Sequence, residues 1–308
     1  MSEHPALIRD DEEGVPVDPP AIGADEGEVE AVPVPAEVSK RPRRNFVAAI
    51  GIGVLFGAVV LALLYFAKPF FLVLVAAFGC VGVWEFGTAL SGRGIKVPLP
   101  PLYAVVVAEV VAGYFAGLTG LALVTAGGVL LLLTWRMVAG VEGYVRDVTA
   151  SVCVAVYVPL LLAFVSLLLA PSDGAHRVVV FIASVFGSDV GGLAVGALIG
   201  RHSLAPVISP KKSWEGLAGS VVLSAAVSGW LVWWLLDGAW WYGAIVGVIA
   251  ALVGTLGDLV ESVIKRDLGI KDMSSLLPGH GGVMDRLDSL TAAAPFVWLA
   301  LSLLVPPG

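Results

Sequence analysis

Long apolar stretches fill this chain from residue 46 almost to its C-terminus. A helix that crosses a bilayer needs about 20 predominantly apolar residues, and short polar breaks divide the apolar sequence into segments of about that length. The pattern predicts an all-α polytopic integral membrane protein with about nine transmembrane helices. The predicted spans are 46–67, 69–90, 99–117, 119–138, 148–170, 178–200, 217–236, 240–263 and 289–305.

Composition strengthens this prediction. Hydrophobic residues make up 58% of the 308 residues, charged residues only 14%, and the mean hydropathy is +0.92. Soluble domains carry about 25% charged residues, so most of the surface is expected to face lipid. The 37 glycines suit helices that pack closely inside a bilayer. The two cysteines lie within apolar runs, which excludes a disulfide scaffold or a cysteine metal cluster.

The N-terminal tail differs from the rest of the chain. Residues 1–39 hold eleven of the 25 acids and only one of the 18 bases, so the remainder is mildly basic although the net charge is −7. A segment this acidic and proline-rich buries too little apolar surface to fold. We expect residues 1–44 to be a disordered cytoplasmic tail ending in a basic cluster, not a signal peptide, and residues 45–308 to form a transmembrane catalytic domain.

Lysine and arginine in the loops predict the orientation, because cytoplasmic loops carry an excess of both. With the predicted spans, two bases fall on one side, Lys68 and Arg177. The other side receives fifteen: Lys40, Arg41, Arg43, Arg44, Arg93, Lys96, Arg136, Arg146, Arg201, Lys211, Lys212, Lys265, Arg266, Lys271 and Arg286. This asymmetry places the N-terminus on the cytoplasmic side of the cell membrane and the C-terminus outside.

One interval, residues 258–288, gathers charge between the last two predicted spans. Asp258 and Glu261 lie three residues apart at the end of one span, and Asp285 and Asp288 have the same spacing at the start of the next. Carboxylates at membrane depth are costly and usually face a polar cavity. Carboxylates from two helices could hold Mg²⁺, with neighbouring bases binding phosphate. A solvated loop would show a similar charge pattern.

Three other features extend this hypothesis. The "GHGG" turn around His280 lets backbone N–H groups approach a phosphate, although any turn between two spans could look the same. "SPKKSWEG" places Lys211 and Lys212 on a second cytoplasmic loop, where the alternative is a helix cap with ordinary loop charge. Asp189 is a lone acid in a predicted span, so it serves either the site or a structural hydrogen bond.

The stretch "SVIKRDLGIKDMSSLLPGHGGVMDRLDS" resembles the signature of the phosphatidate cytidylyltransferase (CDP-diacylglycerol synthase) family. "ISPKKSWEG" resembles a second stretch of that family, with Ser213 where threonine is usual, and strong similarity runs from about 186 to 289. "SDVGG" departs from the family's Asp-x-x-Ala-Tyr. The matching signature positions are Ser262, Lys265, Arg266, Lys271, Asp272, Pro278, His280, Gly281, Gly282, Asp285, Arg286 and Asp288.

The resemblance implies a dimeric membrane enzyme that transfers the cytidylyl group of CTP to phosphatidate in the inner leaflet, using Mg²⁺ with K⁺ beside it. It implies metal binding by Asp258 and Asp285, with Asp288 close by. The expected catalytic residues are Asp258, Lys265, Arg266, His280, Asp285 and Asp288. The residues expected to bind the phosphates of CTP or phosphatidate are Asp189, Ser209, Lys211, Lys212, Ser262, Lys271, Asp272, Gly281, Gly282 and Arg286.

Three other functions are compatible with parts of the sequence. A CTP-dependent polyprenol or dolichol kinase would release CDP instead of pyrophosphate. A secondary transporter could use Asp189 and Asp258 as coupling groups, although such proteins often contain repeats and we see none here. An inactive scaffold would not need the filled Asp and Lys positions. No feature suggests a nucleic-acid partner.

Overall fold

The structure is a computed structural model that describes residues 57–276 and 281–307. The predicted tail, 1–44, and the first part of the predicted span 46–67 lie outside these residues. The elements are α2 (Lys68–Ser91), α3 (Leu99–Val138), α4 (Tyr144–Ala155), the π-helical η1 (Val156–Leu160), α5 (Leu161–Leu169), α6 (Gly174–Ile199), β1 (Ser203–Ala205), β2 (Ser209–Ser213), α7 (Trp214–Leu235), α8 (Trp240–Asp267) and α9 (Met284–Leu304). A short apolar helix, Gly57–Phe66, precedes them.

The described residues form seven helices that are long and apolar enough to cross a membrane, counting Tyr144–Leu169 as one. A polytopic helical membrane protein is therefore confirmed, but the predicted count of nine is not. Only ten residues of the first predicted span belong to a described helix. The spans predicted at 99–117 and 119–138 both lie within α3.

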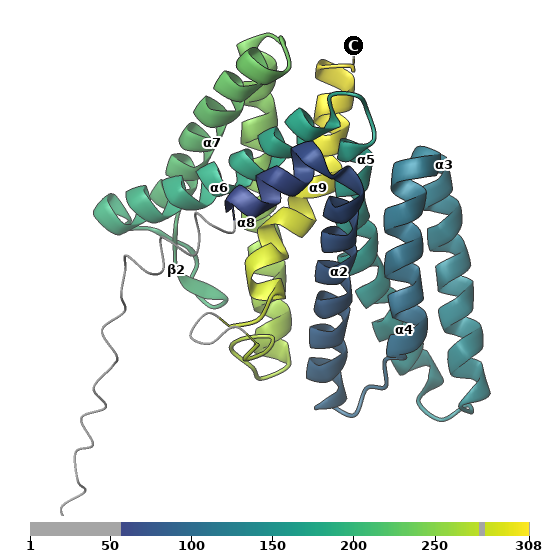
Figure 1. The fold of residues 1–308 in the computed structure, drawn as a ribbon. Helices are drawn as coiled ribbons and strands as arrows, with labels where there is room; N and C mark the ends of the chain where they lie inside the picture. Colours follow the sequence, from purple (N-terminus) through teal and green to yellow (C-terminus); the bar gives the residue numbers. More distant parts are fainter. Residues whose placement is uncertain (1–56, 277–280, 308) are drawn as a thin grey trace, which may run out of the picture. The chain divides into compact units, whose positions relative to one another are not determined.

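Helix α3 is bent back on itself at Gly117. This glycine has φ 63° and ψ −158°, outside the helical region, and the positive φ is readily adopted only by a residue without Cβ. Thr125 Oγ1 donates a 2.7 Å hydrogen bond to Glu109 Oε1 across the bend, and Figure 1 shows the two halves side by side. The boundary between the spans predicted at 99–117 and 119–138 therefore lies within one residue of Gly117, whose backbone conformation makes the bend.

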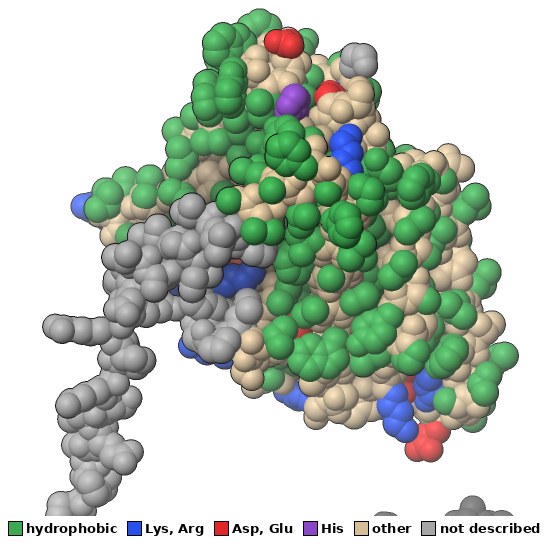
Figure 2. Space-filling view, in the orientation of Figure 1, with side chains coloured by type: hydrophobic (Ala, Val, Ile, Leu, Met, Phe, Trp, Pro, Cys, Tyr) green, Lys and Arg blue, Asp and Glu red, His purple; other side chains and the backbone are tan. Residues whose placement is uncertain are grey.

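The loops gather at two ends of the bundle. At one end, Arg93 Nη2 donates to the Asp267 carbonyl oxygen at 2.9 Å, and Arg146 Nη2 donates to that of Gly94 at 2.6 Å. At the other end, Arg177 Nη2 donates to the carbonyl oxygen of Val305 at 2.7 Å. Figure 2 shows hydrophobic side chains over the middle of one face, with charged side chains mainly at its edges. This is the arrangement expected of a bundle surrounded by lipid.

Small residues allow α6, α7 and α8 to pack closely (Figure 1). Ser224 Oγ on α7 contacts the carbonyl oxygens of Ser184 on α6 and Gly247 on α8, at 2.8 and 2.9 Å. Ser220 Oγ donates to the carbonyl oxygen of Ser188 at 2.7 Å. Serine and glycine at helix interfaces let backbones approach and supply hydrogen bonds away from water. These three helices provide a rigid frame for the cavity described next.

Candidate active site

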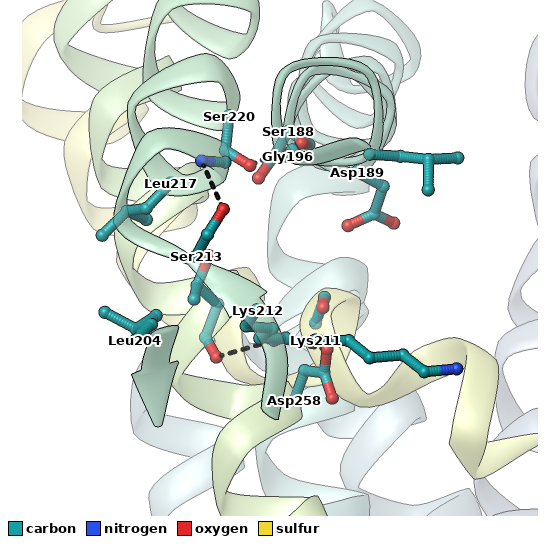
Figure 3. A pocket seen from close by; sticks show the side chains of 15 residues that line it. Ser188, Asp189, Gly196, Leu204, Lys211, Lys212, Ser213, Leu217, Ser220 and Asp258 are labelled. Atoms are coloured by element: carbon teal, nitrogen blue, oxygen red, sulfur yellow. Dashed lines mark hydrogen bonds and ion pairs between the residues drawn. The ribbon is translucent and has the colours of Figure 1, made fainter. Parts of the chain in front are cut away.

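A cavity of about 300 Å³ opens between α6, the β1–β2 hairpin, α7 and α8. Four residues that the sequence placed in the site lie on its wall: Asp189, Lys211, Lys212 and Asp258 (Figure 3). The other lining residues are mostly small or hydroxylated: Ser188, Gly192, Leu193, Gly196, Leu204, Ser213, Gly216, Leu217, Ser220, Thr255 and Ser289. The cavity thus combines four charged side chains with a largely small and apolar lining, and helices of membrane-spanning length border it.

The central contact of the cavity is an ion pair between Lys212 Nζ on β2 and Asp258 Oδ2 on α8. Lys212 Nζ also lies 3.4 Å from the carbonyl oxygen of Thr255, and Ser262 Oγ donates to Asp258 Oδ1 at 3.3 Å. The side chains of Lys212 and Asp258 remain 24% and 33% exposed. Both charges are therefore held in position and still accessible to a ligand.

Asp189 lies on α6, across the cavity from this pair. Asp189 is exposed, and Figure 3 shows its carboxylate directed toward the same space as Lys212 and Asp258. Lys211 is exposed, and its side chain extends away from Lys212 in that view. Alternation along a strand explains this divergence, because successive side chains point to opposite faces.

The β1–β2 hairpin fixes the position of the two lysines. Ser213 Oγ accepts a 3.1 Å hydrogen bond from the backbone N–H of Gly216, so it caps α7, as the sequence allowed. Glu215 Oε1 and His202 Nδ1 lie 2.5 Å apart, which ties the first turn of α7 to the residue before β1. Ser209 begins β2, opposite Ala205, and is half-buried. The sequence pattern predicts a loop here, whereas the structure has two short strands.

A second lysine–carboxylate cluster joins α8 and α9. Lys265 Nζ lies 3.1 Å from Glu261 Oε1 and 2.7 Å from Asp285 Oδ1. The side chains of Lys265, Glu261 and Asp285 are 13%, 0% and 9% exposed. One ammonium therefore bridges two buried carboxylates, each on a different helix.

The other oxygen of Asp285 is also engaged. Asp285 Oδ2 accepts hydrogen bonds from the backbone N–H groups of Met273, at 3.0 Å, and Gly282, at 2.7 Å. Gly281, at φ 81°, has the left-handed backbone conformation that favours glycine. Asp285 thus connects the segment before residues 277–280 to the segment after them.

Asp288 lies one turn farther along α9 and is buried. Its Oδ1 accepts a 2.6 Å hydrogen bond from the backbone N–H of Ser289, a residue that lines the cavity. Gly257 allows α8 and α9 to meet here, since a Cβ on it would lie 2.8 Å from the carbonyl oxygen of Asp288. The carboxylate pairs predicted on α8 and α9 are therefore brought to one helix interface.

The remaining predicted residues lie at the edge of these clusters. Arg266, Lys271, Asp272 and Arg286 are exposed. His280, a predicted catalytic residue, and Pro278 fall outside the described residues. The sequence placed all six in one charged interval, and the described members do lie at the charged end of the bundle.

Glu85 on α2 is a residue that the sequence analysis missed. It is fully buried, and its carboxylate accepts hydrogen bonds from Ser274, Val283 and Met284. The signal was available, because Glu85 is an ionisable residue inside a predicted span, as Asp189 is. The apolar sequence around Glu85 concealed its link to the charged interval.

The donor set is chemically compatible with a hard divalent cation. No group of three or more His, Cys, Asp or Glu residues with metal-binding geometry occurs among residues 57–276 and 281–307. However, Asp258 and Asp285 each hold a lysine ammonium on a carboxylate oxygen, and carboxylate oxygens are the ligands that Mg²⁺ takes, together with substrate phosphates. A cation bound to either carboxylate would share it with the lysine ammonium or displace that ammonium.

Similarity to known proteins covers both the cavity and the helices. Residues 47–304 match the cytidylyltransferase family. The phosphatidate cytidylyltransferase of Mycobacterium bovis is 38% identical over 304 residues, covering 94% of this chain and 97% of that protein. The Mycobacterium leprae enzyme of the same name is 40% identical over 287 residues, covering 86% and 90%. The chain belongs to the phosphatidate cytidylyltransferase (CDP-diacylglycerol synthase) family.

Proposed function

We propose that this protein transfers the cytidylyl group of CTP to phosphatidate, giving CDP-diacylglycerol and pyrophosphate for phospholipid biosynthesis. The observation that carries the proposal is the partly exposed Lys212–Asp258 pair, which lines a cavity together with Lys211 and Asp189. Family membership supports the same reaction. A cavity at the charged end of a membrane bundle would be open to a lipid phosphate from the bilayer and to a nucleotide from water.

The reaction needs charge neutralisation more than acid–base chemistry. A phosphate oxygen of phosphatidate attacks the α-phosphorus of CTP, and the bond from that phosphorus to the bridging oxygen of the β-phosphate breaks, releasing pyrophosphate. The attacking oxygen is already anionic, so no strong base is required. Catalysis of phosphoryl transfer is mostly positioning and electrostatic stabilisation. Lys212 and Lys265 are placed to supply positive charge in this way.

The metal belongs to the proposal. Asp258 and Asp285, with Asp288 nearby, would hold Mg²⁺, and K⁺ would bind beside it. When bound, Mg²⁺ neutralises charge on the phosphoryl oxygens. Lys212 and Lys265 would then contact substrate phosphates in place of part of their present carboxylate contacts. This exchange requires accessible carboxylates, and Asp258, at 33% exposure, is the most accessible of the paired acids in these two clusters.

The other site residues have supporting roles in the proposal. Lys211, Arg266, Lys271 and Arg286 would bind the phosphates of CTP or the phosphatidate head group, since all four are exposed basic residues. His280 would donate to a phosphate or to the leaving pyrophosphate. The remaining residues would complete the polar lining and the phosphate-binding turn: Asp189, Ser209, Ser262, Asp272, Gly281 and Gly282.

The proposed enzyme is a homodimer in the cell membrane, with the N-terminus and the active site cytoplasmic and the C-terminus outside. The loop charges support this orientation, because fifteen bases fall on one side and two on the other. Basic residues at the cytoplasmic surface also favour the approach of an anionic lipid. The tail, residues 1–44, would lie on the same side as the active site.

The test is a product assay on the purified full chain in detergent. Phosphatidate, Mg²⁺ and CTP labelled at the α-phosphorus should give labelled lipid, and EDTA should abolish the label. CTP labelled at the γ-phosphorus should leave the lipid unlabelled and label pyrophosphate instead. Label from the γ-phosphorus in a lipid acceptor, with release of CDP, would overturn the proposal in favour of a kinase.

A further inference from the structure

Glu85 is an unusual residue for its position. It lies in the apolar helix α2 and is 0% exposed, where an ionised side chain is costly unless it is well compensated. None of the ion pairs among the described residues involves Glu85, whereas Asp258, Glu261 and Asp285 each meet a lysine. The compensation for its burial comes from hydrogen bonds instead.

Those hydrogen bonds all come from the signature region. Glu85 Oε1 accepts from Ser274 Oγ at 2.6 Å and from the backbone N–H of Val283 at 2.8 Å. Glu85 Oε2 accepts from the backbone N–H of Met284, the first residue of α9, at 2.7 Å. The first N–H groups of a helix lack intrahelical acceptors, and a carboxylate there is also favoured by the helix dipole. Glu85 therefore caps α9 from another helix.

Gly282 makes this arrangement possible. A Cβ at Gly282 would lie 2.6 Å from Glu85 Oε1, so only glycine leaves room for the carboxylate at this distance. The N–H of Gly282 donates to Asp285 Oδ2, and Asp285 Oδ1 contacts Lys265. Glu85 accepts from Val283 and Met284, and Asp285 accepts from Gly282, the residue before them. Glu85 is therefore linked through this turn to the cluster of Lys265, Glu261 and Asp285.

We propose that Glu85 is a positioning residue of the active site, which fixes the first turn of α9 and thereby the metal-binding geometry of Asp285 and Asp288. The inference rests on the proposed function for the role of the two aspartates. Burial of α9 against α5, α6 and α8 already anchors the helix in the bundle, so the three hydrogen bonds serve the geometry of its N-terminal turn. Positioning residues of metal sites typically change metal affinity or activity by about 10- to 100-fold.

The test compares Glu85→Gln with Glu109→Gln. Both are fully buried acids in apolar helices, but Glu109 contacts Thr125 within α3 and no residue of the site. Mn²⁺ affinity, measured by electron paramagnetic resonance in the presence of CTP, should fall about 10- to 100-fold in Glu85→Gln and remain at the wild-type value in Glu109→Gln. The Mg²⁺ concentration for half-maximal turnover should rise in parallel, with little change in the KM for phosphatidate.

The measurement remains informative if a variant is unstable. Ser274→Ala removes one of the three hydrogen bonds and leaves the carboxylate in place, so it should give a smaller loss of Mn²⁺ affinity in the same direction. Wild-type Mn²⁺ affinity in both Glu85→Gln and Ser274→Ala would overturn the inference. Because Mn²⁺ binding is read without turnover, this outcome differs from a failure of the proposed function, in which wild-type protein would form no labelled lipid.

Discussion

Two lysine–carboxylate clusters of similar chemistry have different surroundings. Lys212 and Asp258 face the cavity with 24% and 33% of their side chains exposed. Lys265, Glu261 and Asp285 lie between α8 and α9 with 13%, 0% and 9% exposed. An exposed ion pair contributes little to stability because water competes for both charges, whereas removing one partner of a buried pair leaves an uncompensated charge. The first cluster can exchange partners with a ligand at little cost in stability, whereas any exchange at the second also disturbs a contact that joins α8 and α9.

The largest expected effect comes from Asp258→Asn, which removes a proposed metal ligand and leaves a side chain of the same shape. Loss of a metal contact worth about 4 kcal/mol lowers turnover about 1,000-fold. Because Asp258 is partly exposed, the melting temperature should change little. Lipid labelling and thermal unfolding in the same detergent measure the two quantities. Turnover near the wild-type rate would contradict the metal assignment.

Lys265→Ala should affect stability most strongly. It leaves Glu261 and Asp285 buried without their shared ammonium, and breaking a buried pair costs about 3–5 kcal/mol. Lys212→Ala should cost less than about 1 kcal/mol, since the Lys212–Asp258 pair is partly exposed. Reversible denaturation in mixed micelles compares the two. Equal losses would remove the distinction between the clusters.

Lys212→Ala should instead weaken nucleotide binding. A hydrogen bond from a charged donor contributes about 1.5–3 kcal/mol, so the KM for CTP should rise about 10- to 100-fold. Lys68→Ala is the matched control, because Lys68 contacts the carbonyl oxygen of Pro171 at the opposite end of the bundle. Steady-state kinetics at fixed phosphatidate concentration measure both variants. An unchanged KM for CTP in Lys212→Ala would place the nucleotide elsewhere.

The smallest effect, and a baseline for both clusters, is expected from Gly117→Ala. The φ of 63° and ψ of −158° at Gly117 are essentially restricted to glycine and cost another residue about 1–3 kcal/mol, although nothing within 4 Å would contact the new Cβ. Stability should fall by that amount, while the KM for CTP stays unchanged. Denaturation and kinetics on one preparation test this. A raised KM would show that the bend of α3 influences the cavity.

The sequence grouped four polar residues that the fold brings together, although their roles stay a prediction. Lys211, Lys212, Asp189 and Asp258 were assigned to one site, and all four line one cavity. Each of these charged residues stands out from the apolar residues around it, so it can be recognised from the local sequence alone. The predicted boundary between spans 99–117 and 119–138 misses the bend at Gly117 by one residue. Glycines are too common in this chain for any one of them to mark a turn.

Two features were not predicted: the strands, whose sequence signal is weak, and the partners of Glu85, which lie far along the chain. Strands β1 and β2 consist largely of Ser, Lys, Pro and Ala, residues that do not favour strands. Glu85 acts through backbone N–H groups of residues far along the chain, and no residue type marks such a donor. Single-chain patterns reveal which side chains are charged more readily than which backbone groups they meet.

The contact between α2 and α9 also has a consequence for assembly. Glu85 and Met284 are 199 residues apart. Helix α2, which carries the accepting carboxylate, is therefore synthesised long before the N–H groups at the start of α9. Contacts of such separation form late because much chain must first be ordered. During synthesis Glu85 therefore lacks the N–H donors of Val283 and Met284 until the last helix emerges. Completion of the proposed site and completion of the bundle become the same event, so a chain that stops before α9 lacks both.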